Sequence, residues 1–233
     1  QVSLILVLNA LSFNLTAQTS IDDERITFVR LTAEQYRNSI RDIFGDSIEI
    51  TGNAIAAGVR EAGLMAVGGR RLTLSSSEVE SYEVLALDVA GQVMSPSRRN
   101  TLIPCRPENE NVFDGDCARE FISTVGFHLF RRSLSEYEIG SYSAMASKAT
   151  ESLGGFYIGL QAALVGMMVS PDFLFRIERS VPSQETPGIR RLDAWSRASR
   201  LSFFLWNTTP SPALLQAAES GELMFEAGLD EQV

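Results

Sequence analysis

Residues 156–169 read Phe156-Tyr157-Ile158-Gly159-Leu160-Gln161-Ala162-Ala163-Leu164-Val165-Gly166-Met167-Met168-Val169, and this stretch decides the fold. It is apolar apart from two glycines and one glutamine, yet it is short for a membrane span. It therefore predicts a buried central helix that other elements cover on every side. We expect an all-α, multi-helix fold of two or more packed layers, with a disulfide-closed loop.

Helix-start signals on both sides of this stretch predict the covering helices. Capping-box spacing is present in Thr32 with Gln35, Ser77 with Glu80 and Ser135 with Glu138. A serine followed by proline, or an aspartate, begins each of the last three predicted helices. The expected helices cover 32–44, 77–94, 117–132, 135–148, 156–169, a stretch from 170 onward, 193–206 and 211–221. Residues 46–75 are expected to form a loop with short pieces, and residues 179–190 a linker.

The N-terminal stretch indicates export. Residues 2–15 carry no charge, and the run Leu4–Leu8 fits the apolar core of a signal peptide but is too short to cross a bilayer. Small residues and then Asp22 follow, so residues 1–17 are expected to be the remnant of a signal peptide cleaved near Ala17. The alternative is a buried helix or strand. Export predicts a periplasmic or secreted protein.

Two cysteines support the same compartment. Cys105 and Cys117 flank a loop rich in Pro, Asn, Asp and Gly, and in an exported protein such a pair is expected to be oxidised. Closing this loop would stabilise the fold by about 3 kcal/mol. Metal and redox roles are the alternatives. Zinc needs about four ligands, whereas this chain has no Cys-x-x-Cys and one histidine, His128.

Composition excludes some partner classes. The chain has 233 residues, 45% of them hydrophobic, and a net charge of −9 with a pI of about 4.8. An acidic surface repels phosphate backbones, so no nucleic-acid partner is expected. No stretch is long and apolar enough to predict an integral membrane span.

Candidate functional residues form no complete catalytic or metal-binding set, so catalytic residues are unknown. Arg176, Arg197 and Arg200 are the polar candidates, since arginines among apolar residues must find carboxylates or carbonyls. We expect Arg200 to meet a buried acid or a helix C-terminus. His128 lies on an apolar helix face and is interpreted as a core or rim histidine rather than a base or ligand.

Carboxylate pairs and aromatic residues are weaker candidates for a catalytic or ligand-binding site. The pairs Asp42/Asp46, Glu78/Glu80 and Glu136/Glu138 could serve hydrolysis, but two of them contain helix-capping residues. The aromatic residues could form a ligand platform, although helical spacing favours a core role; they are Phe173, Phe175, Trp195, Phe203, Phe204 and Trp206.

Four motifs carry a family resemblance. Residues 30–45 resemble "R-L-T-x-x-E-Y-x-N-T-[IV]-R-D-L-[LF]-G", and residues 130–134, after Cys117, resemble part of "A-F-R-R-P-L". Residues 170–178 resemble "S-P-x-F-L-[YF]-R-x-E", and residues 198–206 resemble "A-S-R-L-S-Y-F-L-W". Together they are similar to large secreted multidomain proteins of planctomycete type, built of domains of unknown function and often associated with c-type cytochrome modules. Departures at Ser133 and at Ser211-Pro212 affect helix caps more than chemistry.

The resemblance covers residues 30–94 and 105–233. It implies a helical module at 30–94, a disulfide-loop and central helical module at 105–180, and the truncated start of a C-terminal module at 190–233. It carries no catalytic residues over. It implies a helical scaffold or interaction module of an exported, haem-associated redox protein, whose partners are other domains of the same protein or a c-type cytochrome. Because the chain has no Cys-x-x-Cys-His, no cofactor is expected in it, and haem c would belong to a partner or a missing portion. The alternatives are part of a secreted enzyme acting on polysaccharide or another biopolymer, and a structural envelope protein.

Overall fold

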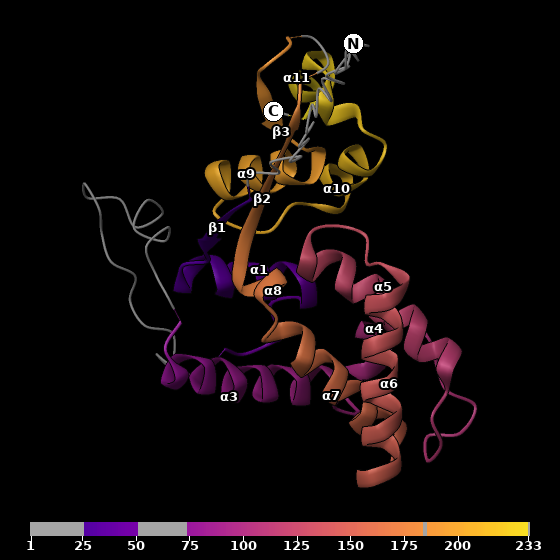
Figure 1. Cartoon of the computed structure of the whole chain (residues 1–233). Helices are drawn as coiled ribbons and strands as arrows, with labels where there is room; N and C mark the ends of the chain where they lie inside the picture. The colour runs from indigo at the N-terminus through magenta and orange to yellow at the C-terminus, as the bar shows by residue number, and fades with distance from the viewer. Residues whose placement is uncertain (1–25, 51–73, 184–185, 233) are drawn as a thin grey trace, which may run out of the picture.

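The computed structural model describes residues 26–50, 74–183 and 186–232. The predicted signal-peptide remnant and residues 51–73 of the predicted loop lie outside these ranges. In the described part, helices dominate and a small sheet joins them (Figure 1). None of the described helices combines the length and hydropathy needed to cross a membrane.

The larger part of the molecule is a helical bundle. Its long helices are α1 (Ala33–Phe44), α3 (Ser76–Val93), α5 (Gly115–Phe130), α6 (Glu136–Leu153) and α7 (Phe156–Met168), with the short α4 (Arg99–Leu102) and α8 (Pro171–Leu174) between them. α7 packs against α3, α5, α6 and α8. Residues of the predicted modules at 30–94 and 105–180 pack in one and the same hydrophobic core.

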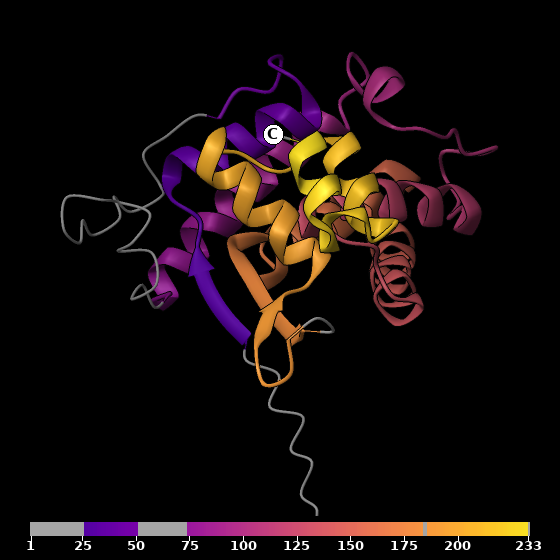
Figure 2. The same cartoon turned by 90° about the horizontal axis from the view of Figure 1, so that it is seen from above.

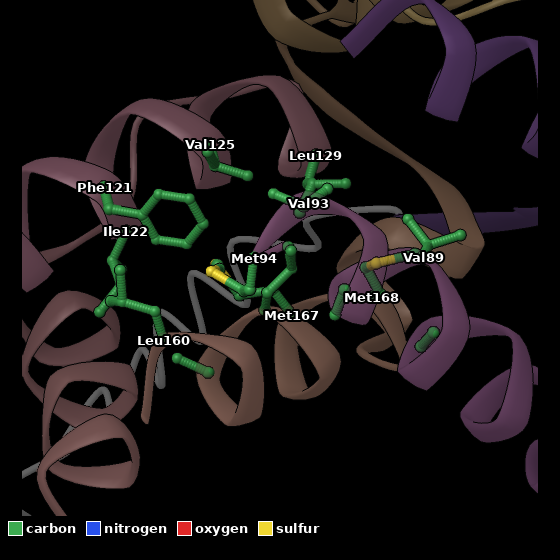
Figure 3. Packing of buried hydrophobic residues seen from close by; sticks show 14 of the residues in the cluster. Val89, Val93, Met94, Phe121, Ile122, Val125, Leu129, Leu160, Met167 and Met168 are labelled. Atoms are coloured by element: carbon green, nitrogen blue, oxygen red, sulfur yellow. The ribbon is translucent and has the colours of Figure 1, made fainter. Parts of the chain in front are cut away.

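The prediction of a buried central helix is confirmed for most of α7. Leu160, Leu164, Met167 and Met168 are fully buried. Figure 3 shows Leu160 and Met167 facing the apolar residues of α3 and α5. The helix is not covered on every side, however, because Ile158 is exposed at its first turn.

Most of the predicted helix caps are present. Thr32 and Ser135 each form a complete capping box, and Gly45 ends α1 with a φ of +88°. The box predicted at Ser77 was wrong: Ser75 accepts from the backbone of Glu78, and the Glu78 carboxylate accepts from the Ser75 backbone at 2.9 Å. Two overlapping Ser-x-x-Glu spacings occur there, and the sequence does not decide between them.

The prediction of a purely all-α fold was wrong. Strands β1 (Ile26–Arg30), β2 (Phe175–Pro182) and β3 (Arg190–Leu192) form an antiparallel sheet in that order. Figure 2 shows β1 and β2 side by side. The helix expected from Ser170 therefore ends at Leu174, and the expected linker contains strand at both ends. Apolar periodicity did not predict β2, because its most buried position is Glu178 and not an apolar residue.

The C-terminal elements surround a second, smaller core. α9 (Ala194–Leu205), α10 (Pro212–Glu219), the 3-10 helix η2 (Glu222–Met224) and α11 (Glu226–Glu231) follow the sheet. The second core consists of Ala198, Leu214, Ala217, Ala218 and Leu223. Helix starts predicted at Asp193 and Ser211 are confirmed by their side-chain caps. The division of the chain into three modules stays a prediction.

The disulfide between Cys105 and Cys117 is confirmed, with Cα atoms 5.4 Å apart. The loop that it closes touches the start of the central helix. The carbonyl oxygen of Glu110 accepts a hydrogen bond of 2.7 Å from the Phe156 backbone. This contact satisfies one of the free N–H groups at the N-terminus of α7.

Close packing of α6 on α7 gives a prediction for Gly159. A Cβ atom there would collide with Thr150 Oγ1 and lie 2.5 Å from the Ala146 carbonyl oxygen. We expect Gly159→Ala to lower the free energy of unfolding by about 1–3 kcal/mol, because the backbones must separate. The measurement is chemical denaturation followed by circular dichroism.

The matched control is Gly140→Ala in α6, where an added Cβ meets nothing within 4 Å. This change should stabilise by up to about 1 kcal/mol, since alanine has the higher helix propensity. Equal effects at the two glycines would contradict the close approach of α6 and α7.

A candidate functional site: the charged joint around Ser170–Glu178

Residues 170–178 contact both the bundle and the C-terminal elements: α8 packs on α5 and α7, and β2 contacts β1, β3 and α9. Ser170 caps α8, and its backbone then turns directly into β2. On one side, β1 pairs with β2 so that Arg30 lies opposite Phe175, and the Leu31 N–H donates to the Leu174 carbonyl at 3.0 Å. Figure 1 shows β2 leading from α8 in the bundle toward α9. This segment is therefore the connection between the bundle and the C-terminal elements. We call residues 170–178, together with the arginines that bind them, the joint.

Arg131 anchors the turn between α8 and β2. It follows the last residue of α5 in a left-handed conformation, with a φ of 58°. Its buried guanidinium donates to the carbonyl oxygens of Asp172 and Phe173 and, at 2.7 Å, to that of Phe175. Burial lowers the pKa of Arg131 to about 9, against the attraction of Asp172. These bonds satisfy carbonyls that the short helix leaves without intrahelical partners.

Arg132 connects the same turn to α6. Its guanidinium lies 2.7 Å from Glu138 Oε1 and 2.8 Å from Asp172 Oδ1. Glu138 also caps α6 by accepting from Ser135. The hydrogen bond from Arg132 is the main reason that the pKa of Glu138 falls to about 2. One carboxylate thus serves both a helix cap and an ion pair.

Glu178 is the acid at the centre of the joint, and its side chain is 2% exposed. Arg176 Nε donates to it at 2.8 Å, and Arg200 donates from Nε at 3.1 Å and again from Nη2. Burial would raise the pKa of Glu178, but the two guanidinium groups together lower it. The sequence led us to expect a buried acid for Arg200, and the structure places Arg200 on Glu178.

The other arginine candidate lies apart from this acid. Arg197 donates from Nε to the Leu192 carbonyl at 3.1 Å and from Nη1 to the Leu223 carbonyl at 2.9 Å. It therefore ties β3 to η2 within the C-terminal elements. Phe203 joins α9 to the joint, because the guanidinium carbons of Arg131 and Arg176 lie 5.7 and 6.0 Å from its ring centre.

A small hollow of about 70 Å³ lies within the joint and has a lining that is mostly charged or polar. It is lined by Phe130, Arg131, Arg132, Asp172, Ile177, Arg179, Asp193, Trp195, Ser196 and Ser199.

Two acids that bind arginines of the joint stay charged. Because Glu138 and Glu178 have lowered pKa values and bind guanidinium groups, both stay ionised near neutral pH. This arrangement suits mechanical connection rather than proton transfer.

Sequence reasoning missed Arg131, Arg132 and Glu178 as members of a site. The signal available was the motif set, because Arg131 and Arg132 lie in the second motif, Glu178 in the third and Arg200 in the fourth. The sequence shows these motifs far apart. Tertiary structure brings them to one place.

The carboxylate pairs have structural partners instead of a shared site. Glu78 pairs with Arg30 at 2.8 Å, Asp46 with Arg41 at 3.4 Å, and Glu136 with Arg119. Asp42 accepts from Thr208 and Glu80 is exposed. Among the described residues, no group of three or more His, Cys, Asp and Glu side chains is arranged to hold a metal ion.

The aromatic candidates do not form one platform. Phe173 is in the main core, with its ring centre 5.2 Å from that of Tyr36, and Trp195 contacts Phe127 edge to face. Phe204 and Trp206 are 82% and 53% exposed. His128 lines the same surface hollow as Trp206, and burial lowers its pKa.

Two family models match parts of the chain. Residues 117–178 match PSD5, "Protein of unknown function (DUF1595)", and residues 192–233 match PSD4, "Protein of unknown function (DUF1592)". Two segments of the chain thus match domains of unknown function, which the resemblance predicts. No curated protein and no solved structure matches the chain. The joint lies where the two matched segments meet: Arg131 and Glu178 belong to the first, and Arg200 to the second.

The pairing around Glu178 gives a prediction for Arg200→Met. Removing this guanidinium leaves a buried carboxylate with less compensation, so the free energy of unfolding should fall by about 1–2 kcal/mol. The control is Arg119→Met, because Arg119 is as exposed as Arg200, at 49%, whereas its partner Glu136 is 79% exposed and Glu178 is 2% exposed. That pair should contribute about 0–1 kcal/mol. Equal losses, or an unchanged melting temperature for Arg200→Met, would contradict the joint.

The lowered pKa of Glu138 predicts acid sensitivity. Its carboxylate is ionised in the fold down to about pH 2, whereas its ordinary pKa is 4.5. Its contribution to stability is therefore present above pH 4.5 and is lost as the pH falls toward 2. Glu138→Gln should be less stable than wild type at neutral pH but should lose less stability over this acid range. The measurement is urea denaturation at several pH values, with Glu136→Gln as the exposed control.

Proposed function

We propose that this chain is a helical scaffold or interaction module of an exported, haem-associated redox protein. The observation that carries the scaffold role is the joint. Charged side chains around Glu178 and Arg131 bind one another or backbone carbonyls, and so they hold the C-terminal elements against the bundle. A module built this way holds the surfaces of the bundle and of the C-terminal elements in a fixed relative orientation.

The disulfide supports export. Disulfides persist in the periplasm and outside the cell and are rare in reducing compartments. Because Cys105 and Cys117 are bonded to each other, neither thiol is free to attach a haem. Any covalently bound haem would therefore belong to a partner or to another portion of the same protein. The resemblance to cytochrome-associated secreted proteins supports that association.

An exposed apolar patch at the end of α9 supports an interaction role. We define this patch as Phe204 and Leu205, which are 82% and 43% exposed. Exposed apolar residues that adjoin one another mark interaction surfaces more often than scattered ones do. We propose that another domain of the same protein, or a c-type cytochrome, covers this patch.

A second candidate function is part of a secreted enzyme that acts on polysaccharide or another biopolymer. The observation that favours it is a surface hollow beside the exposed Trp206, which is also lined by His128 and Asp42. Such a site would be separate from the joint.

The experiment is purification of the full-length protein from its natural host, followed by a visible absorption spectrum. We expect a Soret band that elutes with this chain. If the haem is on a separate polypeptide, Phe204→Ser should remove that polypeptide, because it makes the patch polar, whereas Val84→Ser on the exposed face of α3 should retain it. A featureless spectrum would overturn the haem association, and retention of a separate haem-bearing polypeptide by Phe204→Ser would overturn the assigned patch.

A further inference from the structure

A larger hollow, of about 460 Å³, lies away from the charged joint. It is bounded by α1, α5, α9 and the segment that connects α9 to α10. Its lining is mixed, with hydroxyl, carboxylate, imidazole and apolar groups: Asp42, Ile43, His128, Ser202, Trp206, Thr208, Thr209, Pro210, Ser211 and Pro212. These residues come from distant parts of the sequence, so the hollow exists only in the folded chain.

The wall of this hollow is fixed by hydrogen bonds. Thr208 Oγ1 donates to Asp42 Oδ2 at 2.6 Å, and Asn38 Nδ2 donates to the Asn207 carbonyl at 3.2 Å. Ser202 Oγ donates to the Thr208 carbonyl at 2.9 Å. Asn207 has a φ of 57°, a left-handed conformation that asparagine tolerates better than most residues. The connecting segment is thus held against α1, which preorganises the hollow for a ligand.

Trp206 presents a large apolar ring at this hollow. It is 53% exposed, while the other tryptophan, Trp195, has its ring centre 5.9 Å from that of Phe127. A tryptophan offers a flat apolar face together with one N–H donor. An exposed indole beside hydroxyl and carboxylate groups can therefore bind a ligand that has both an apolar face and many hydroxyl groups.

The charge of the lining favours a neutral ligand over an anionic one. Among the described residues, no arginine or lysine lines this hollow, and the one charged side chain that they contribute to it is the carboxylate of Asp42. Burial lowers the pKa of His128, so its imidazole is neutral at neutral pH. The acceptor on Asp42 and the hydroxyls of Thr208 and Ser211 match the hydroxyl groups of a neutral ligand.

We propose that this hollow binds a neutral oligosaccharide, with one sugar ring stacked on Trp206 and its hydroxyls hydrogen-bonded to Asp42 and Thr208. A second hollow, also of about 460 Å³, shares His128 and Pro212 with the first. Ser123, Thr124, Gln216 and Glu219 add further neutral or acidic polar groups there. The two hollows together give room for several sugar units.

This inference specifies a ligand for the hollow named in the second candidate function. It concerns binding alone and does not depend on the scaffold role or on haem. The test uses the complete chain with four neutral hexasaccharides: cellohexaose, xylohexaose, mannohexaose and laminarihexaose. Binding is measured by calorimetry and by the indole N–H signals in a nitrogen–proton correlation spectrum. The chain has two tryptophans, and the signal missing from Trp206→Ala identifies Trp206.

We expect at least one hexasaccharide to bind and to shift the Trp206 signal more than the Trp195 signal. Trp206→Ala should weaken this binding at least about tenfold, and the patch variant Phe204→Ala should change it less than about twofold. Both replaced side chains are largely exposed, so both variants should keep the wild-type melting temperature.

Three results would overturn the inference. They are dissociation constants weaker than about 10 mM for all four sugars, equal binding by Trp206→Ala, or tighter binding of an oligogalacturonate than of every neutral sugar. Loss of the haem-bearing partner on Phe204→Ser concerns the other surface, so the two proposals fail separately.

Discussion

The buried guanidinium of Arg131 is the interaction on which the rest of this structure depends. A cation removed from water must find replacement partners, and Arg131 finds them in the carbonyl oxygens of Asp172, Phe173 and Phe175. Those carbonyls are available because α8 is only four residues long and turns directly into a strand. The bonds fix the direction in which β2 leaves the bundle. The positions of β1, β3 and α9 follow from that direction, since each of them contacts β2.

Ion pairs add to the connection that the hydrogen bonds of Arg131 form between the bundle and the C-terminal elements. Glu178 lies where β2 meets α9, and its burial is tolerated because Arg176 and Arg200 approach it from both elements. The matched segments at residues 117–178 and 192–233 both contribute to this joint. Three motifs that look like separate signatures in the sequence thus contribute to two ion clusters. Arg132, Glu138 and Asp172 form one, and Arg176, Glu178 and Arg200 form the other. The second cluster favours one placement of α9 on β2, because a shift would leave the buried Glu178 carboxylate with fewer partners.

The joint and the two proposed surfaces have separate physical roles. Inside the joint, charges bind one another and keep little capacity for a ligand. At the end of α9, by contrast, Phe204 and Trp206 are exposed, and each meets different surroundings. Phe204 belongs to an apolar patch that suits another protein surface, while Trp206 borders a polar hollow that suits a sugar. A rigid joint would keep both surfaces in a constant relation to the bundle.

The sequence by itself determined the features whose causes are local. Helix starts at Thr32, Ser135, Asp193 and Ser211 were predictable because a cap involves residues three positions apart. The burial of most of α7 followed from its composition, and the disulfide from its loop. Tertiary structure alone decided the sheet, because the buried position of β2 is a glutamate that needs Arg200 of α9 in addition to Arg176 of its own strand. It also decided the hollow at Trp206, where Asp42 and Thr208 meet across 166 residues of sequence. A local pattern reports what a segment buries, and it cannot report which distant charge or hydroxyl makes that burial favourable.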